Sequence, residues 1–471
     1  MILTEVKLLL KARTSQIVFL FLLFSSMMVM ADVIRDESQI QTYDMFMESI
    51  KQTVYIEENQ LESSLQEYNA VKNMGLEADT KAKKMKVNLM QQQYEEGMNT
   101  YNQILSLKRD DTETINQIWS KYLVRRQLRM SLLFGTTEFH DENPLKIFSQ
   151  EITEYPEIFD SFDVSFFDYD VYTSMDYTYG SHDMFQKHNE YENRISMLRA
   201  AIYTYEHEIP VAVYDLRGPE LFHLRLFTKD TLFGVGSLLS AFLFFFLHSY
   251  HFRSLNMDQY YMALPMKKGK VYQSHMLSSL LTFLILYLVA YALPWVILAL
   301  RYGVSWMNYP AIIDANLLTS YQGATNQLSD GVYGMTPFVS TNPGPDLTFY
   351  PTLEANIQVI PYGMSMMIVL LCTMFQILCI SISCTYLVFM IRKRMILTMT
   401  MICLLMLLAV TRVSFIPILS YIPLLYPSAI YLLNAGHGIG IIALCLISIS
   451  WSFLLLYLGS KQSNHQDYAE D

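Results

Sequence analysis

The residues of this chain that are best suited to chemistry lie in a short basic segment between two long apolar runs. The segment reads Leu264-Pro265-Met266-Lys267-Lys268. Ammonium groups in such a place bind lipid phosphates or acidic protein side chains, so they offer recognition and not bond-making. The alternative is a merely basic loop that follows the rule keeping Lys and Arg on the cytoplasmic side of a membrane.

A short helix is predicted directly before this basic segment. Residues 254–263 allow about two and a half helical turns before Pro265 ends them. Met257, Tyr260, Tyr261 and Leu264 would give that helix an apolar knob that fits a cleft in a partner. The segment therefore predicts a docking element for a second protein.

The sequence contains no pattern typical of catalysis or nucleotide binding. It holds no G-x-x-x-x-G-K-[ST] loop, no G-x-S-x-G and no H-E-x-x-H. The apolar runs also lack the paired carboxylates of a proton-coupled carrier. We therefore expect no enzyme activity, no cofactor and no metal site. Any energy for transport has to come from another polypeptide.

Two polar residues inside apolar runs, Gln376 and Arg412, are candidates for a transport pathway. A lone polar side chain at membrane depth marks either a contact between helices or a pathway, and for Gln376 a helix contact is the simpler explanation. Arg412 is followed by a proline-interrupted apolar stretch. That stretch predicts a short re-entrant pair of helices, because broken backbone in the bilayer has to be covered by protein or water.

The composition indicates a membrane protein with a large acidic part. Of the 471 residues 52% are hydrophobic and 16% are charged, and several apolar runs reach the roughly 18–20 residues that cross a bilayer. The net charge of −11 is uneven, since residues 32–220 hold 34 acidic and 18 basic residues. This acidic part argues against nucleic acid as a partner. It contains none of the five cysteines, which fits a bacterial cell surface.

Basic residues between the apolar runs set the expected topology, with both termini in the cytoplasm and six spans in the plasma membrane. The expected fold is an all-α polytopic membrane protein whose six transmembrane helices carry a large, mostly helical, stalk-like extracellular domain between spans 1 and 2. The expected segments are an amphipathic cytoplasmic helix (1–16), spans at 17–34, 230–252, 271–300, 359–391, 395–412 and 437–458, an extracellular domain (35–229), a cytoplasmic coupling loop (253–270), a second extracellular loop (301–358), a cytoplasmic loop (392–394), a re-entrant extracellular segment (413–436) and a cytoplasmic tail (459–471).

The extracellular domain is expected to have two parts, a helical stalk over 36–130 and an acidic, aromatic cap over 131–229. Apolar residues recur at helical spacing in the first part, with breaks at Asn73-Met74-Gly75 and Lys108-Arg109-Asp110-Asp111. We expect two long helices paired as in an antiparallel coiled coil, then a third. In the cap, residues 156–183 form either an aromatic core or a recognition surface for a cationic ligand, and a core is the simpler explanation.

The first apolar run allows two interpretations. It is an uncleaved first span, or it is a secretory signal with a cleavage site at Val29-Met30-Ala31. Both place residue 32 outside the cell.

Together these features resemble the permeases of ABC-2 type transporters. The resemblance rests on the six spans, the amphipathic N-terminus, the large insertion after the first span, Leu264-Pro265 with the basic residues after it, and Val271-Tyr272 at the start of the third span. Two positions depart from the family pattern, because His275 stands where lysine is more usual and Asp258 stands in for an upstream glutamate. The likeness covers the membrane part, about half of the chain. More loosely, the large insertion resembles those of bacterial permeases for sodium or antimicrobial-peptide export and resistance.

The resemblance implies two permease chains, as a homodimer or a heterodimer, each docked on a separate ATP-binding subunit through this loop. It implies an exporter of a peptide, lipid-like or ionic substrate. The alternative is a membrane-anchored sensor or adhesin with a coiled-coil ectodomain and no transport activity. The residues assigned to ATPase coupling are Met257, Asp258, Tyr260, Tyr261, Leu264, Pro265, Lys267 and Lys268.

Overall fold

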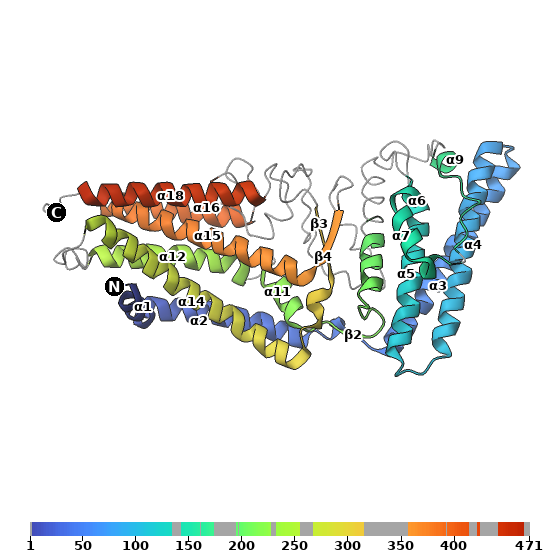
Figure 1. Cartoon of the computed structure of the whole chain (residues 1–471), viewed down its shortest axis with the longest axis horizontal. Helices are drawn as coiled ribbons and strands as arrows, with labels where there is room; N and C mark the ends of the chain where they lie inside the picture. Colours follow the sequence, from blue (N-terminus) through green and yellow to red (C-terminus); the bar gives the residue numbers. More distant parts are fainter. Residues whose placement is uncertain are drawn as a thin grey trace.

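The structure is a computed structural model that is mostly helical and elongated (Figure 1). It describes residues 2–133, 143–160, 162–173, 195, 197–227, 232–254, 267–314, 357–391, 393–413, 422–423 and 441–465. Apolar helices run along the long axis, and a second group of helices lies at the other end of the molecule. The two groups match the change in composition between the acidic part of the sequence and the apolar runs.

The apolar group is a bundle of long helices. Three of them, α2, α14 and α15, are long and apolar enough to cross a membrane, and α12 and α16 contain the shorter apolar stretches Gly236–Phe252 and Met395–Leu408. The helices of this group are α1 (Ile2–Lys11), α2 (Arg13–Arg35), α11 (Pro219–Phe227), α12 (Leu232–Ser254), α14 (Lys268–Tyr302), α15 (Tyr362–Met390), α16 (Arg394–Val413) and α18 (Ile441–His465).

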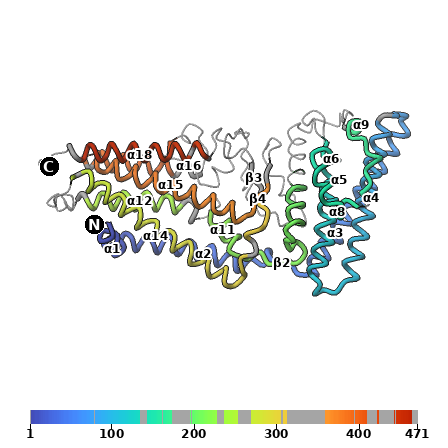
Figure 2. The backbone as a smooth tube through the Cα atoms, viewed as in Figure 1, coloured from blue at the N-terminus to red at the C-terminus, as the bar shows by residue number. Residues whose placement is uncertain are grey.

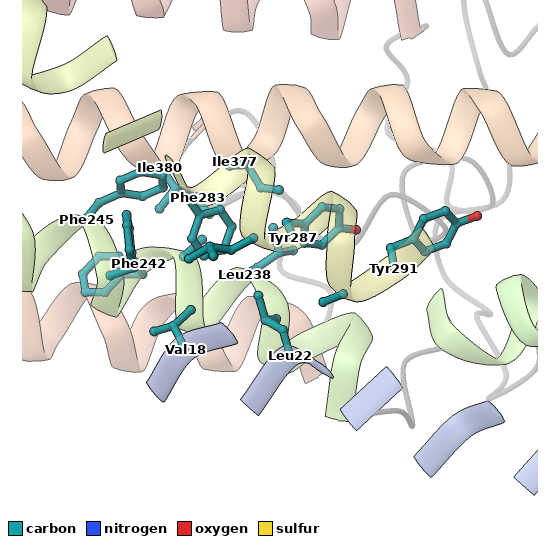
Figure 3. Close-up of a cluster of buried hydrophobic side chains, with 14 of the residues drawn as sticks. Val18, Leu22, Leu238, Phe242, Phe245, Phe283, Tyr287, Tyr291, Ile377 and Ile380 are labelled. Carbon is teal, nitrogen blue, oxygen red and sulfur yellow. The ribbon is translucent and has the colours of Figure 1, made fainter. Parts of the chain in front are cut away.

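An aromatic and aliphatic core holds this bundle together (Figure 3). Phe245 of α12 packs on Phe283 of α14 with ring centroids 5.3 Å apart, and Leu22 of α2 belongs to the same buried cluster. On the outer face, large apolar side chains such as Phe24, Met399 and Phe453 are exposed. Apolar side chains on both the inner and outer faces suit helices surrounded by lipid.

Three long helices dominate the second group. They are α3 (Tyr43–Asn73), α4 (Glu77–Leu105) and α5 (Thr112–Leu133), so the helix breaks predicted near residues 73–75 and 108–111 are confirmed. Gly75 has a φ of +75°, which a residue without a side chain adopts readily, and this lets the chain reverse between α3 and α4. Four short helices follow, α6 (Pro144–Ile147), α7 (Ser149–Glu154), α8 (Pro156–Phe159) and α9 (Tyr169–Thr173).

The second group is set crosswise to the apolar bundle. Figure 1 shows α3, α4 and α5 running across the long axis of the molecule, whereas α12, α14 and α15 run along it. Figure 2 shows the chain passing from α2 into this group and returning to α11. The long helices α3, α4 and α5 therefore lie across the axis of the bundle and do not continue it.

Two small antiparallel ribbons depart from the all-α expectation. β1 (Ile40–Gln41) pairs with β2 (Tyr214–Asp215), where the chain leaves and re-enters the bundle. β3 (Pro310–Asp314) pairs with β4 (Ile357–Pro361) over five residue pairs, so the two ends of the region predicted as an irregular loop are tied together. Sequence periodicity misses such pairs because five-residue strands separated by a long connection leave little local signal.

Ion pairs join the apolar bundle to the segments that connect it with the second group of helices. Arg225 of α11 places Nη1 2.6 Å from Oδ2 of Asp32 at the end of α2, and its other nitrogen bonds to Asp36. Arg217 pairs with Asp215 of β2 at 2.7 Å and also donates to the backbone oxygen of Ile34. These contacts hold side by side the two segments through which the chain passes from one group of helices to the other.

Candidate functional site

The helices that flank the basic segment define the candidate site. α12 ends at Ser254 and α14 begins at Lys268, with Lys267 exposed at the N-cap of α14 in an extended conformation. Lys268 is therefore the first residue of the third long apolar helix. The predicted coupling residues that lie outside the described part of the chain are Met257, Asp258, Tyr260, Tyr261, Leu264 and Pro265.

Five helix ends meet beside this segment. The Phe252 ring of α12 stacks on the His275 ring of α14 with centroids 4.0 Å apart, and Tyr272 meets Phe389 of α15 edge to face at 5.2 Å. Gln273 Nε2 lies 3.4 Å from the Ser460 hydroxyl oxygen of α18. With α1, these ends form one face of the bundle, which we call the basic end.

The basic end collects cationic residues that are far apart in the sequence. They lie in α1, in the helix ends that meet here or directly beside them, and they are Lys7, Lys11, Arg13, Lys267, Lys268, Lys270, Lys393 and Lys461. These residues therefore lie at one end of the apolar helices, where Figure 1 also places the N-terminus.

A buried carboxylate–imidazole pair fastens α1 to α14 at the basic end. Glu5 Oε1 lies 2.7 Å from Nδ1 of His275, and its other carboxylate oxygen lies 3.1 Å from the Ser278 hydroxyl. The side chain of His275 is 1% exposed and that of Glu5 is 6% exposed. Because water has almost no access, this hydrogen bond is electrostatically stronger than a surface contact and costly to break.

Two further contacts pack the same end tightly. Ser15, two residues into α2, has its hydroxyl 3.2 Å from Nε2 of His248 on α12. Gly459 of α18 lies so close to Tyr272 that a Cβ atom would stand 2.5 Å from the ring carbon Cζ. The beginning of α2 is thereby held to α12, and the end of α18 to α14.

The two candidate pathway residues lie in different helices. Gln376 is buried in the middle of α15, within the apolar core, where a contact between helices remains the simpler explanation. Arg412 lies in the last turn of α16, which continues through it to Val413, and the structure does not describe its side chain. The predicted re-entrant segment falls outside the described residues except at positions 413, 422 and 423.

A second polar cluster lies at the opposite end of the bundle, on α11. The Glu220 side chain is 3% exposed, and its two carboxyl oxygens have no hydrogen-bond partner among the described residues. The neighbouring His223 places Nδ1 2.9 Å from the Tyr291 hydroxyl, and the Tyr362 hydroxyl donates to the backbone oxygen of Glu220. Burial raises the pKa of Glu220 to about 7 and lowers the pKa of His223 to about 3.

The pKa of Glu220 predicts a specific pH dependence of stability. The folded protein holds the carboxyl proton more tightly than the unfolded chain, in which the pKa is 4.5. Stability should therefore fall as the pH rises from about 4.5 to 7, by up to about 3 kcal/mol from this group. Glu220→Gln removes the titration, so the loss in melting temperature between pH 5 and pH 8 should shrink.

The exposed Glu37 offers a matched control for this measurement. Glu37→Gln should leave the pH dependence as it is in the unchanged protein. An equal pH dependence in Glu220→Gln and the unchanged protein contradicts the assignment.

The described residues at the two ends of the bundle form hydrogen bonds, ring contacts and tight packing contacts. Within this part of the chain, no three His, Cys, Asp or Glu side chains gather in a way that could hold a metal ion. The Glu5–His275 pair was missed from sequence, although Glu5 is an acidic residue in an otherwise basic amphipathic helix. In the sequence, His275 differs from the lysine that is usual in the family pattern, and nothing near it in the chain indicates a partner on α1.

Comparison with known proteins adds no relative. No family model, no curated protein and no solved structure matches this chain.

Proposed function

We propose that this chain is the permease subunit of an ATP-driven ABC transporter of the ABC-2 type, energised by a separate ATP-binding subunit. The substrate is a peptide, a lipid-like molecule or an ion, and the direction is export. The assembly holds two permease chains, identical or different, each with its own ATPase. The partner ATPase supplies the phosphate chemistry for which this sequence has no motif.

The observation that carries the proposal is the Glu5–His275 contact. Two separate features of the resemblance are the amphipathic N-terminal helix and the basic segment that opens the third span. The buried pair brings them together, because His275 lies seven residues after Lys268 and its partner lies on α1. A force applied to the basic segment would therefore reach α1 and α14 together, as a coupling element requires.

The proposed topology has six spans, formed by α2, α12, α14, α15, α16 and α18. The gathering of cationic residues at the basic end supports a cytoplasmic position for that end and for both termini. The helices α3 to α9 then lie outside, on the surface of a bacterial plasma membrane. The exposed apolar side chains of α2, α16 and α18 would face lipid or the second permease.

The test is whether an ATPase remains bound when the apolar knob before the basic segment is destroyed. Tyr261→Asp and Leu264→Asp place a carboxylate where a cleft of the ATPase would need apolar contact, which costs several kcal/mol when buried. Each variant should insert into the membrane normally and lose the ATP-binding protein that co-purifies with the unchanged chain. Quantitative mass spectrometry of gently solubilised membranes measures this loss.

Gln462→Asp is the matched control, because Gln462 is exposed on α18 at the same end of the bundle. This variant should retain the ATPase. If both knob variants also retain it, the coupling assignment is wrong. If no ATPase accompanies even the unchanged chain, a sensor or adhesin without transport activity becomes the better explanation.

A further inference from the structure

The helices at the far end of the molecule line a cavity that is partly open to solvent and that the proposed transport function does not use. Its volume is about 880 Å³, and its walls come from α4, α5, α8 and the segment around Tyr205. Ligand sites for small molecules span about 300–1,000 Å³, so the cavity is large enough for an organic molecule.

The charges that line the cavity favour a cation. Five glutamates and three basic residues contribute to the walls. Two of the basic residues, Arg125 and Arg129, are already bound to Glu96, with N–O distances of 2.8 and 2.5 Å. Glu96 offsets only one of these two arginine charges, so the other arginine charge and Lys121 face four further glutamates, and the lining keeps an excess of two negative charges; these glutamates are Glu95, Glu157, Glu206 and Glu208.

Two buried acceptors in the wall lack donors. Ser120 lines the cavity and is 3% exposed, yet its hydroxyl has no hydrogen-bond partner among the described residues. The amide nitrogen of Gln92 donates to the backbone oxygen of Asp163 at 3.0 Å, which fixes the amide orientation. The amide oxygen of Gln92 is buried and has no donor among the described residues. Buried acceptors of this kind are normally satisfied, so a ligand with N–H groups would complete the wall.

Two tyrosines contribute aromatic surface next to the carboxylates. The rings of Tyr155 and Tyr205 meet edge to face with centroids 6.5 Å apart. Tyr155 donates its hydroxyl to Glu206, and Tyr205 lies 3.5 Å from Glu157. The bond to Glu206 raises the pKa of Tyr155, so this phenol stays neutral. Neutral aromatic faces beside carboxylates attract ammonium groups.

We propose that this cavity binds a small organic cation that carries primary amines. The ammonium groups would pair with Glu157, Glu206 and Glu208, while their N–H donors would reach the free acceptors of Ser120 and Gln92. A bare metal ion fits less well, because the described carboxylates do not gather closely enough to form a metal site. The proposal does not depend on transport or on an ATPase.

Spermidine is a suitable probe, and the full-length protein in detergent is titrated with it by calorimetry. The double variant Glu206→Gln/Glu208→Gln removes two exposed carboxylates and should weaken binding at least about tenfold, through lost charge–charge attraction. The matched control Glu58→Gln/Glu62→Gln removes two exposed carboxylates from α3, outside the cavity, and should bind as the unchanged protein does. A neutral diol of similar length should not bind.

The outcome distinguishes a site from a general attraction to an acidic surface. An equal loss of spermidine affinity in both double variants, or no binding at millimolar concentration, overturns the proposal. Melting temperatures measured without spermidine show that both variants are folded, since all four substituted side chains are exposed.

Discussion

Glu57→Ala is expected to lower the melting temperature of the protein by on the order of 10 °C, which corresponds to a loss of about 3–5 kcal/mol in the free energy of unfolding. Glu57 is buried between α3 and α5, where Oε1 lies 2.9 Å from Nε of Arg126. The same oxygen accepts hydrogen bonds from the Tyr122 hydroxyl at 2.6 Å and from Gln93 at 2.7 Å. Removing it leaves a buried guanidinium without its carboxylate.

A second substitution separates the unpaired charge from the lost packing. Glu57→Ala/Arg126→Met leaves no unpaired charge, so it should recover part of the stability lost in Glu57→Ala. Glu58→Ala removes an exposed carboxylate one residue further along α3 and should change the melting temperature by less than about 2 °C. A loss in Glu57→Ala as small as that in Glu58→Ala contradicts the prediction.

The protonation of Tyr122 supports this interpretation. Burial, and after it the charge of Glu57, raises the pKa of Tyr122 well above its ordinary value. The phenol therefore keeps its proton and remains a donor to the carboxylate. The pocket is also tight, because a Cβ atom on Gly97 would stand 2.6 Å from the second carboxylate oxygen of Glu57.

Breaking the Glu5–His275 pair should have an effect of similar size at the opposite end of the molecule. Either Glu5→Ala or His275→Ala removes one partner of a buried pair and should destabilise the protein by about 3–5 kcal/mol. The double variant should lose much less than the sum of the two single losses, because neither partner is then left alone. Thermal unfolding in detergent, measured for all four proteins, gives this coupling energy.

Thr4→Ala is the control for this cycle, since Thr4 is exposed and adjacent to Glu5 on α1. It should leave the melting temperature nearly unchanged. Additive losses in the double variant would show that Glu5 and His275 act independently and that α1 is held by its apolar contacts alone.

The Glu5–His275 cycle and the ATPase test address different claims. A strong coupling energy shows that Glu5 and His275 stabilise the contact between α1 and α14, whether or not an ATPase binds. Loss of the ATPase in Tyr261→Asp would show that the segment before Lys267 is needed to bind the ATPase. If α1 is fastened to α14 and the ATPase is lost, the basic end both receives the partner and holds the helices that would respond to it.

Local features of the chain were predictable from the sequence. The helix breaks near Gly75 and between Leu105 and Thr112 follow from residues within one turn of each break. The long apolar helices α2, α14 and α15 follow from runs of apolar residues, whose burial or contact with lipid does not depend on a particular neighbour. The boundaries were less accurate, because α14 begins at Lys268 and α18 continues to His465.

The sequence by itself determined the division into an acidic helical part and an apolar part, and it showed that the G-x-x-x-x-G-K-[ST] pattern is missing. Only the tertiary structure decided which distant side chains meet. Glu5 and His275 are 270 residues apart, and Glu57 and Arg126 are 69 residues apart. Composition and periodicity report on the preferences of a residue and its near neighbours, whereas a buried pair or a cavity depends on where whole helices cross.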